Sequence, residues 1–348
     1  MPKISVIMPV FNVSAYIRQA MNSVLCQSFQ DFEVIVVDDG STDDTPLILS
    51  NFARSDSRVR VFSQRNSGIV AALNRAVSEA RGEFLARMDG DDVCLPKRFE
   101  RQVQFLSDRP GVDICGCWYE TFSAERSQRS VLPQTHEEIV CELLYSNPIC
   151  HPSVFLRRLA LEASGLRYRD THLYAEDYDL WVRAAHQLKF ANLPEVLFRL
   201  RSHAERTTNT KAAVMAASTT AIQSRILQNV FNRPLTEEEL TLHQQLSTGA
   251  QLDTLDGITQ VQKWAADLVA ANECSASLPP QSFQIVTCKR WARFCFQNGR
   301  KGVRVWSAYR AGPRPVASPS TAEYRLWLKC VLKGNPVMRV KACFRRGE

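Results

Sequence analysis

The stretch Val34-Ile35-Val36-Val37-Asp38-Asp39-Gly40-Ser41 decides the fold, because a run of apolar residues passes directly into two carboxylates and a glycine. A short apolar run that ends in turn residues is typical of a strand buried on both faces of a sheet. Carboxylates at the tip of a buried strand cost free energy unless they hold something. Asp38 and Asp39 therefore predict either a ligand contact, such as one to a base or a ribose hydroxyl, or a plain turn before a helix.

A second stretch, Phe84-Leu85-Ala86-Arg87-Met88-Asp89-Gly90-Asp91-Asp92, repeats this layout. Asp89 and Asp91 are two residues apart, so their side chains point the same way along an extended segment. Gly90 between them lets the backbone approach a ligand closely. A hard divalent cation takes one or two carboxylates together with phosphate oxygens and water. The pattern favours a metal-bound diphosphate over its alternative, an acidic turn before the next helix.

A third acidic stretch, Tyr174-Ala175-Glu176-Asp177-Tyr178-Asp179-Leu180-Trp181, opens a segment with apolar residues at helical spacing. Carboxylates in the first turn of a helix interact favourably with the helix dipole. A positioned carboxylate can equally serve as a general base. By itself this stretch leaves both interpretations open.

Short apolar runs and helix-like segments alternate through the first part of the chain. This alternation predicts an α/β domain whose mostly parallel, Rossmann-like sheet has helices on both faces. Ligands of such sheets collect beyond the carboxyl ends of the strands. We expect Asp43 or Asp44 to cap the second helix and Ser67 to cap the third. The expected strands are 4–10, 32–37, 59–62, 83–88, 112–119 and 153–157, and the expected helices between them are 15–25, 46–54, 70–80 and 97–106.

After about residue 206 the strand signal fades, and the segments that follow have helical spacing. We therefore expect two domains, an α/β domain over residues 1–205 and a mainly helical region over residues 206–348. Residues 311–319 hold three prolines and a glycine and predict a loop. The expected helices of the second region are 207–231, 236–246, 255–271 and 283–297.

The net charge of +7 is unevenly distributed. Residues 1–205 hold 23 Lys and Arg against 27 Asp and Glu, a net of −4, whereas residues 206–348 hold 20 against 9, a net of +11. From Gln281 onward the count is 15 against 2, and aromatic residues interleave with the basic ones. Residues 324–333 have the spacing of a helix with one basic and one apolar side. Such a helix can lie in the headgroup region of an anionic membrane, although packed aromatics beside a solvated basic face would give the same pattern.

No run of the sequence approaches the roughly 18 apolar residues that a membrane span requires. Met1-Pro2-Lys3 leads straight into the first strand, which leaves no room for a signal peptide. The 11 cysteines include no Cys-x-x-Cys pair, and we expect reduced, mostly buried thiols. We therefore expect a cytoplasmic protein, peripheral at the inner face of the cell membrane if its tail binds lipid.

Taken together, the acidic stretches and their neighbours resemble glycosyltransferase family 2, of the type that builds bacterial cell-surface polysaccharides, which has the GT-A fold. The resemblance covers residues 4 to about 205, and Leu200 stands where the last motif of the family has a tyrosine. The segments that carry it, in the family's order, are Ser5-Val6-Ile7-Met8-Pro9-Val10-Phe11-Asn12, residues 36–43, residues 66–74, Asp89-Gly90-Asp91-Asp92, His151-Pro152-Ser153, residues 176–181 and Arg199-Leu200-Arg201-Ser202-His203.

The resemblance implies a role for each matching residue. Asp177 would be the general base with Glu176 beside it, and Asp91 would bind Mg²⁺ or Mn²⁺ on the diphosphate. His203 would contact the metal or the phosphates, and His151 either packs or meets the acceptor. Pro9, Phe11, Asp39 and Asp89 would hold the nucleoside. The remaining donor-site residues would be Val10, Asn12, Asp38, Asn66, Gly68 and Gly90.

The implied reaction is an inverting transfer of a sugar from a nucleotide-diphosphate donor to a hydroxyl of a lipid-linked or cell-envelope glycan. The resemblance implies a UDP-linked donor, since uridine is the commonest base in the family. A nucleotidyltransferase of related fold is the first alternative, but it calls for a glycine-rich loop where Pro9-Val10-Phe11-Asn12 stands. The second alternative is a module that binds membranes or nucleic acid. It leaves the acidic stretches unexplained, and no nucleic-acid motif is present, so we expect no nucleic-acid partner.

Overall fold

The computed structural model describes residues 1–203, 210–314 and 321–331. It divides into two compact units. The first contains residues 1–143 and 147–222, and the second contains residues 144–146 together with the chain from residue 223. The predicted boundary between a catalytic domain and a helical region, at residues 205 and 206, stays a prediction.

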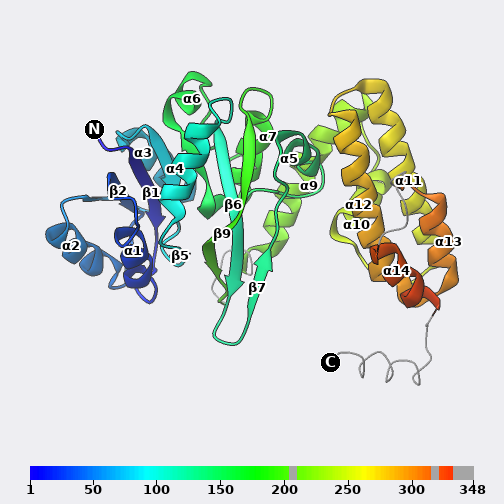
Figure 1. The fold of residues 1–348 in the computed structure, drawn as a ribbon, viewed down its shortest axis with the longest axis horizontal. Helices are drawn as coiled ribbons and strands as arrows, with labels where there is room; N and C mark the ends of the chain where they lie inside the picture. Colours follow the sequence, from blue (N-terminus) through cyan, green and yellow to red (C-terminus); the bar gives the residue numbers. More distant parts are fainter. Residues whose placement is uncertain (204–209, 315–320, 332–348) are drawn as a thin grey trace. The chain divides into compact units, whose positions relative to one another are not determined.

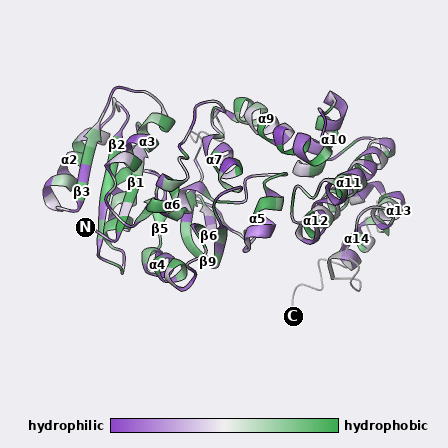
Figure 2. Ribbon diagram, turned by 90° about the horizontal axis from the view of Figure 1, so that it is seen from above, coloured by the Kyte–Doolittle hydropathy of each residue, from purple (hydrophilic) through white to green (hydrophobic). Residues whose placement is uncertain are grey.

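The N-terminal half of the sheet is parallel, as the alternating pattern predicts. Its strands are β1 (Ile4–Val10), β2 (Phe32–Asp38), β3 (Val59–Ser63) and β4 (Phe84–Arg87), in the spatial order β3-β2-β1-β4 (Figure 1). Every residue of β1 and β2 is buried, and hydrophobic residues predominate along β1 (Figure 2). Full burial explains why these strands carry continuous apolar runs.

The other half of the sheet is mixed. β8 (Phe155–Arg157) pairs antiparallel with β4 and with β6 (Ile114–Phe122), and β9 (Phe190–Arg201) then runs parallel to β6. The register between β6 and β9 shifts at Trp118. Pro194 and Glu195 interrupt the apolar run of β9, which is why the sequence pattern does not predict this strand. The short strands β5 (Val93–Cys94) and β7 (Ser127–Ser130), also not predicted, pair antiparallel with β9 and β6.

The predicted helices of the first unit form, within a few residues of their expected bounds. Ile17, Ala20, Met21 and Val24 lie along one face of the first helix and are buried, at the spacing of an amphipathic helix. Three further short segments were not predicted as helices: α5 (His136–Glu142), α6 (Arg158–Ala163) and the 3-10 turn η1 (His151–Ser153). The other helices of this unit are α1 (Ile17–Leu25), α2 (Thr45–Ser55), α3 (Ile69–Glu79), α4 (Arg98–Asp108) and α7 (Glu176–Ala184).

Two helix starts differ from the expected caps. The N-cap of α3 is Gly68, with φ of +85°, and no side chain of that residue or of Ser67 caps the helix. The prediction of a Ser67 cap is therefore wrong. At the start of α2 the side chain of Asp44 makes no cap bond, and Asp43 Oδ1 accepts from the backbone N–H of Thr45 at 3.0 Å instead.

The second unit is helical. Thr236 and Glu239 form the reciprocal bonds of a capping box at the start of α10, which is the acidic start that the sequence displays. Trp291, Phe294 and Tyr309 are buried inside this unit. Part of the predicted 311–319 loop lies outside the described residues. The helices are the end of α9 (Ala212–Phe231), α10 (Glu237–Thr248), α11 (Leu255–Ser275), α12 (Pro280–Asn298), α13 (Val303–Ala311) and α14 (Thr321–Val331), with the 3-10 turn η2 (Gly299–Lys301).

Residues 144–146 belong to the second unit through hydrogen bonds. His243 Nε2 lies 2.9 Å from the Leu144 carbonyl oxygen, and the Tyr145 hydroxyl lies 2.7 Å from Thr287 Oγ1. Within the described ranges, no helix is both long enough and apolar enough to cross a bilayer.

Candidate active site

The first acidic stretch forms a turn beyond β2 in which Asp39 is fully engaged. Asp39 is 4% exposed, and its Oδ1 accepts from the backbone N–H of Ser67 at 2.9 Å and from Gln64 Nε2 at 2.8 Å. Its Oδ2 accepts from the backbone N–H of Gly68 at 2.8 Å. These N–H groups immediately precede α3, so Asp39 fixes the approach of the chain to this helix without capping it. The carboxylate therefore joins two loops at the edge of the sheet, and the contact of Asp38 or Asp39 with a nucleoside stays a prediction.

Asn12 fixes the same edge from β1. It has a left-handed backbone, with φ of +50°, its N–H donates to Ser41 Oγ at 2.9 Å, and its Oδ1 accepts from the Thr42 N–H at 2.8 Å. Asn tolerates this conformation better than most residues. Gly40 is required nearby, because a Cβ there would lie 2.9 Å from the Asn66 nitrogen. The predicted donor residues of β1 and of the β2 turn therefore lie together, with the ring of Phe11 46% exposed beside them.

The second acidic stretch gathers three carboxylates beyond β4. Asp89, Asp91 and Asp92 each offer one oxygen, and these oxygens all lie within 4.8 Å of one another. Gly90 is needed at the turn, because a Cβ there would lie 2.8 Å from Val10 Cγ1. A set of carboxylate oxygens alone suits a hard cation such as Mg²⁺ or Mn²⁺. The residues present therefore fit the predicted metal, and Asp92 adds a carboxylate that the prediction did not assign.

The end of β9 holds this cluster in place. The backbone N–H of Arg201 donates to Asp92 Oδ1 at 2.7 Å, and Arg201 Nε donates to the carbonyl oxygen of Asp91 at 2.7 Å. His203 Nε2 lies 2.9 Å from Asp91 Oδ2, and its ring packs against that of Tyr16 with centroids 4.8 Å apart. The structure therefore brings His203 to the predicted metal ligand Asp91. Leu200, which replaces the tyrosine of the family motif, is buried and leaves this contact intact.

The third acidic stretch begins α7. Asp177 Oδ2 accepts from Asn147 Nδ2 at 2.7 Å, and its Oδ1 accepts from the backbone N–H of Tyr178 at 2.7 Å. His151 Nδ1 lies 3.9 Å from Asp177 Oδ2. The Asp177 side chain nevertheless remains 19% exposed, whereas Glu176 is 7% exposed. Asp177 is thus an oriented carboxylate with access to solvent, which is the geometry that a general base needs.

Burial dominates the ionisation of the carboxylate pair. Together with the charge of Asp177, burial raises the pKa of Glu176 to about 7. Burial also raises the pKa of Asp177, whereas the hydrogen bond from the Tyr178 N–H and the positive charge of Arg87 lower it. Because the two groups interact, they titrate as a pair whose apparent pKa values belong to both.

His151 and Tyr168 are buried next to this carboxylate pair. His151 Nε2 lies 2.8 Å from the Tyr168 hydroxyl, and burial holds the pKa of His151 well below its usual range. Burial also raises the pKa of Tyr168. A neutral imidazole has one donor and one acceptor nitrogen, so the tautomer of His151 sets which of the two groups donates in this contact.

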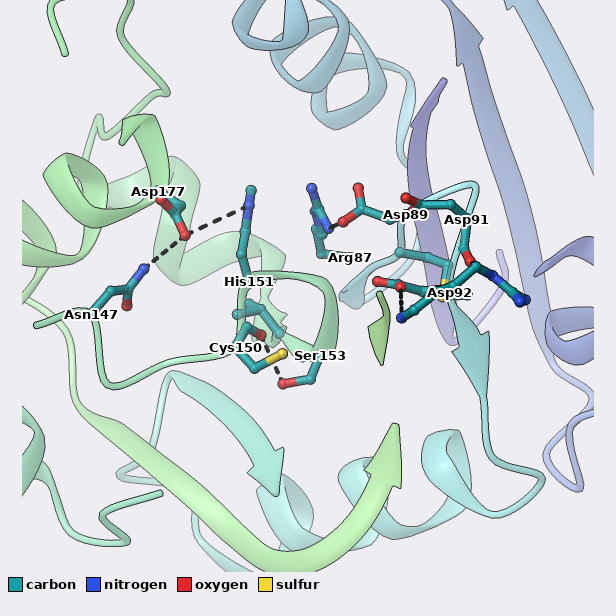
Figure 3. A network of polar contacts seen from close by, with 12 residues as sticks. Arg87, Asp89, Asp91, Asp92, Asn147, Cys150, His151, Ser153 and Asp177 are labelled. Carbon is teal, nitrogen blue, oxygen red and sulfur yellow. Dashed lines mark hydrogen bonds and ion pairs between the residues drawn. The ribbon is translucent and has the colours of Figure 1, made fainter. Parts of the chain in front are cut away.

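Arg87, the last residue of β4, connects the two halves of the site. Its guanidinium forms an ion pair with Asp89 and is 4% exposed. Figure 3 shows Arg87 between the Asn147, His151 and Asp177 group and the Asp89, Asp91 and Asp92 group. Sequence reasoning assigned no role to Arg87, Asn147 or Tyr168, since no local motif marks them. A cationic residue inside an apolar strand was the one available signal, and it applied to Arg87 alone.

Comparison with known proteins identifies the family to which the chain belongs. The family model described as "Glycosyl transferase family 2" matches residues 5–164. EpsE of Bacillus subtilis, a relative described as a glycosyltransferase, is 32% identical over 210 residues, which cover 59% of this chain and 74% of EpsE. The chain belongs to glycosyltransferase family 2. An uncharacterised glycosyltransferase of Haemophilus influenzae is 29% identical over 219 residues, covering 60% of this chain and 68% of that protein.

Solved structures place the family 2 chain in the GT-A fold class. S. aureus TarS 1–349 in complex with UDP-GlcNAc superimposes with a TM-score of 0.56 at 18% identity, over 99% of this chain and 92% of that one. A longer TarS crystal structure gives a TM-score of 0.55 at 20% identity, and this chain spans 55% of its length. At these identities the likeness concerns the fold. The predicted family and fold class are confirmed.

Proposed function

We propose that this glycosyltransferase moves a sugar from a UDP-sugar to an acceptor hydroxyl with inversion at the anomeric carbon. The observation that carries the proposal is the pairing of two carboxylate groups at one sheet edge, the Asp89, Asp91 and Asp92 cluster and the oriented Asp177. The TarS structure with UDP-GlcNAc has a related fold, which motivates the choice of a uridine donor. Catalysis is assigned to residues 1–205, in which all of these groups lie.

Asp91 would hold a divalent cation, Mg²⁺ or Mn²⁺, with His203 at its side, and Asp89, which is predicted to hold the nucleoside, offers a carboxylate oxygen close to the same position. A cation there supplies positive charge next to the diphosphate of the donor. The predicted nucleoside contacts Pro9, Phe11 and Asp39 belong to the adjoining edge. A single displacement needs no covalent sugar–enzyme intermediate, and this scheme uses none.

Asp177 performs the proton transfer in this scheme. Its carboxylate, held by Asn147 and the Tyr178 N–H, accepts the proton of the acceptor hydroxyl while the hydroxyl oxygen attacks the anomeric carbon. The bond from that carbon to the diphosphate oxygen breaks on the opposite face. Glu176 lies beside the base with a raised pKa and adds negative charge that favours proton uptake by the pair.

The acceptor is proposed to be a lipid-linked or cell-envelope glycan, and the basic second unit is proposed to bring the enzyme to an anionic membrane surface. The support for docking is charge, since residues 206–348 carry a net of +11. A panel of UDP-, GDP- and dTDP-sugars, assayed for metal-dependent release of the nucleoside diphosphate, tests the donor assignment. Release from none of the panel would contradict the proposal, and release from a GDP-sugar alone would correct the base.

A further inference from the structure

Arg87 is a buried cation with unused hydrogen-bond donors. A guanidinium offers five N–H groups. The Arg87 side chain is 4% exposed, its ion pair with Asp89 is made through Nη1, and its Nε makes no hydrogen bond to any described residue. A buried charge normally has its donors filled, because an unfilled one costs free energy. Such a group inside an active site points to a partner that arrives with the substrate.

Arg98, a second buried arginine of the same region, shows the ordinary structural pattern. Its Nε donates to Gln102 Oε1 at 2.9 Å, and its Nη2 donates to the carbonyl oxygen of Arg87 at 2.8 Å. Arg157 likewise donates from Nε to the carbonyl oxygen of Val112 at 2.9 Å. Both arginines tie protein segments together through carbonyl and amide oxygens. Arg87 differs from them because its side chain forms an ion pair with Asp89, a carboxylate of the predicted donor site.

The position of Arg87 identifies the partner. In a displacement with inversion, the anomeric carbon lies between the attacking oxygen at the base and the leaving oxygen on the diphosphate. Arg87 lies between Asp177 on the base side and Asp89 on the diphosphate side (Figure 3). Both flanking carboxylates are partly exposed, at 19% and 28%, so substrate can reach the space between them. In the proposed reaction, the negatively charged group of the donor between these two sides is its β-phosphate.

We propose that Arg87 is a further catalytic residue, which donates hydrogen bonds to the β-phosphate of the bound donor and stabilises the charge that grows there as the sugar leaves. This proposal rests on the proposed function. The ion pair with Asp89 keeps the guanidinium in place before the donor binds. Hydrogen bonds from a cation to a phosphate oxygen are stronger than neutral ones, and a donor that meets developing charge lowers the barrier directly.

The test compares UDP with UMP, which lacks the β-phosphate. Their dissociation constants are measured by calorimetry, with Mg²⁺ present and absent, for the full chain and for Arg87→Met. In the parent protein UDP should bind more tightly than UMP, and Arg87→Met should reduce this preference about tenfold or more while UMP affinity stays within about twofold. An unchanged ratio of the two constants would overturn the proposal, because a purely structural Arg87 has no reason to recognise the β-phosphate.

Arg157→Met is the matched control, since it also removes a guanidinium beside β4, but that guanidinium bonds to backbone carbonyl oxygens and contacts the Phe84 ring rather than a carboxylate of the site. It should lower the melting temperature and leave the ratio of the UDP and UMP dissociation constants unchanged. If Arg157→Met reduces the preference for UDP as much as Arg87→Met does, the proposed role of Arg87 is contradicted. If Arg87→Met does not fold, Arg87→Lys and Arg87→Gln replace it, and the lysine variant should retain more of the UDP preference. Turnover of a UDP-sugar should fall about 10²–10³-fold in Arg87→Met.

The outcome for Arg87 is separable from that of the proposed function. If the parent protein binds UDP and releases it from a sugar donor but Arg87→Met keeps the full preference for UDP, only the inference about Arg87 fails. If the parent protein prefers no nucleoside diphosphate over its monophosphate, among the uridine and guanosine pairs, the proposed donor class fails and the inference about Arg87 fails with it.

Discussion

Asn147 Nδ2 donates to Asp177 Oδ2 across 2.7 Å, and this bond joins the loop before η1 to the first turn of α7. The Tyr178 N–H holds the other carboxylate oxygen, so Asp177 has both oxygens oriented. An oriented base loses less entropy in the transition state than a freely rotating one. We therefore expect Asn147 to position Asp177, the proposed base.

Asn147→Ala should lower kcat about tenfold with little change in KM for the donor, since a single hydrogen bond to a charged group contributes about 1.5–3 kcal/mol at most. Steady-state kinetics with both substrates varied measures this split. Asn51→Ala, at an exposed position of α2, serves as the control and should match the parent protein. An effect on donor KM alone would place Asn147 in the donor site.

Asp177→Asn should reduce turnover about 10²–10⁴-fold, which is the usual loss for a positioned base, with UDP affinity nearly unchanged. NMR analysis of the product from the parent enzyme should show inverted anomeric configuration. Retention of configuration would reject the single displacement. Loss of UDP binding with turnover of bound donor preserved would reassign Asp177 to the donor site.

Asp91→Asn should remove most of the metal-dependent activity, because it weakens a three-carboxylate cluster that suits a hard cation. Activity is measured against Mg²⁺ and Mn²⁺ concentration, and a chelator should abolish it in the parent protein. Asp44→Asn, at an exposed position before α2, is the control for the loss of one negative charge. Full activity of the parent protein in a chelator would contradict the metal assignment.

Glu176 makes the stability of the protein depend on pH. Its folded-state pKa is raised from 4.5 to about 7, first by burial and then by the charge of Asp177. The folded state therefore binds the Glu176 proton more tightly than the unfolded state, and this contribution to stability is lost as the pH rises from about 4.5 to about 7.

Glu176→Gln should remove the cost of ionising a buried carboxylate and should stabilise the protein at pH 8 by about 1–3 kcal/mol, with a smaller gain or none at pH 5. Urea denaturation at the two pH values measures the difference. Asp108→Asn, at an exposed position near the end of α4, is the matched control and should give the same change at both pH values. A larger stabilisation at pH 5 than at pH 8 would contradict the raised pKa.

Sequence patterns located the parts of this fold that are buried on both faces. β1 and β2 are fully buried and apolar except at Ser5, Glu33 and the terminal Asp38, so the carboxylates that follow β2 and β4 stand out. β9 escaped prediction because Pro194 and Glu195 interrupt it and because its partner β6 shifts register at Trp118. Such a strand is specified by pairing with a distant segment, which local periodicity does not record.

The residues of the candidate site likewise fall into those that a local motif marks and those that only tertiary structure brings together. Asp89, Asp91 and Asp177 stand in acidic motifs and were predicted from the chain alone. Arg87, Asn147 and Tyr168 acquire their roles only from neighbours far along the chain, such as the 30 residues that separate Asn147 from its partner Asp177. Hydrogen bonds over such separations depend on tertiary structure, so no pattern in a single sequence indicates them.

The proposed membrane docking needs a surface, and the structure limits which residues can form it. Trp291, Phe294 and Tyr309, all counted among the interleaved aromatics, are buried in the helical unit and are not available. Phe296 and Trp327 remain 42% and 38% exposed. Tyr324 and Phe344 carry the same expectation, but the side chain of the first and the whole of the second lie outside the described residues.

Basic residues accompany the exposed aromatics. Lys329 Nζ lies 4.0 Å from the centroid of the Phe296 ring, and the charge of Arg300 acts on the same lysine, whose pKa burial lowers. A truncation near residue 279 would remove α12, whose buried Trp291 and Phe294 belong to the core of the helical unit, so it would not test docking. Substitutions on the surface are the sharper experiment.

Arg300→Glu combined with Lys301→Glu should reduce sedimentation with vesicles that contain anionic lipid, because each basic residue near such a surface contributes about 1 kcal/mol and its reversal opposes binding. The parent protein should pellet with these vesicles at low salt and be released at high salt. Arg54→Glu combined with Arg109→Glu makes the same change of net charge on the first unit and should leave sedimentation nearly unchanged. If the two double variants lose sedimentation equally, attraction follows net charge and no docking surface exists on the helical unit. Recovery of the parent protein in the supernatant at low salt would rule out docking altogether.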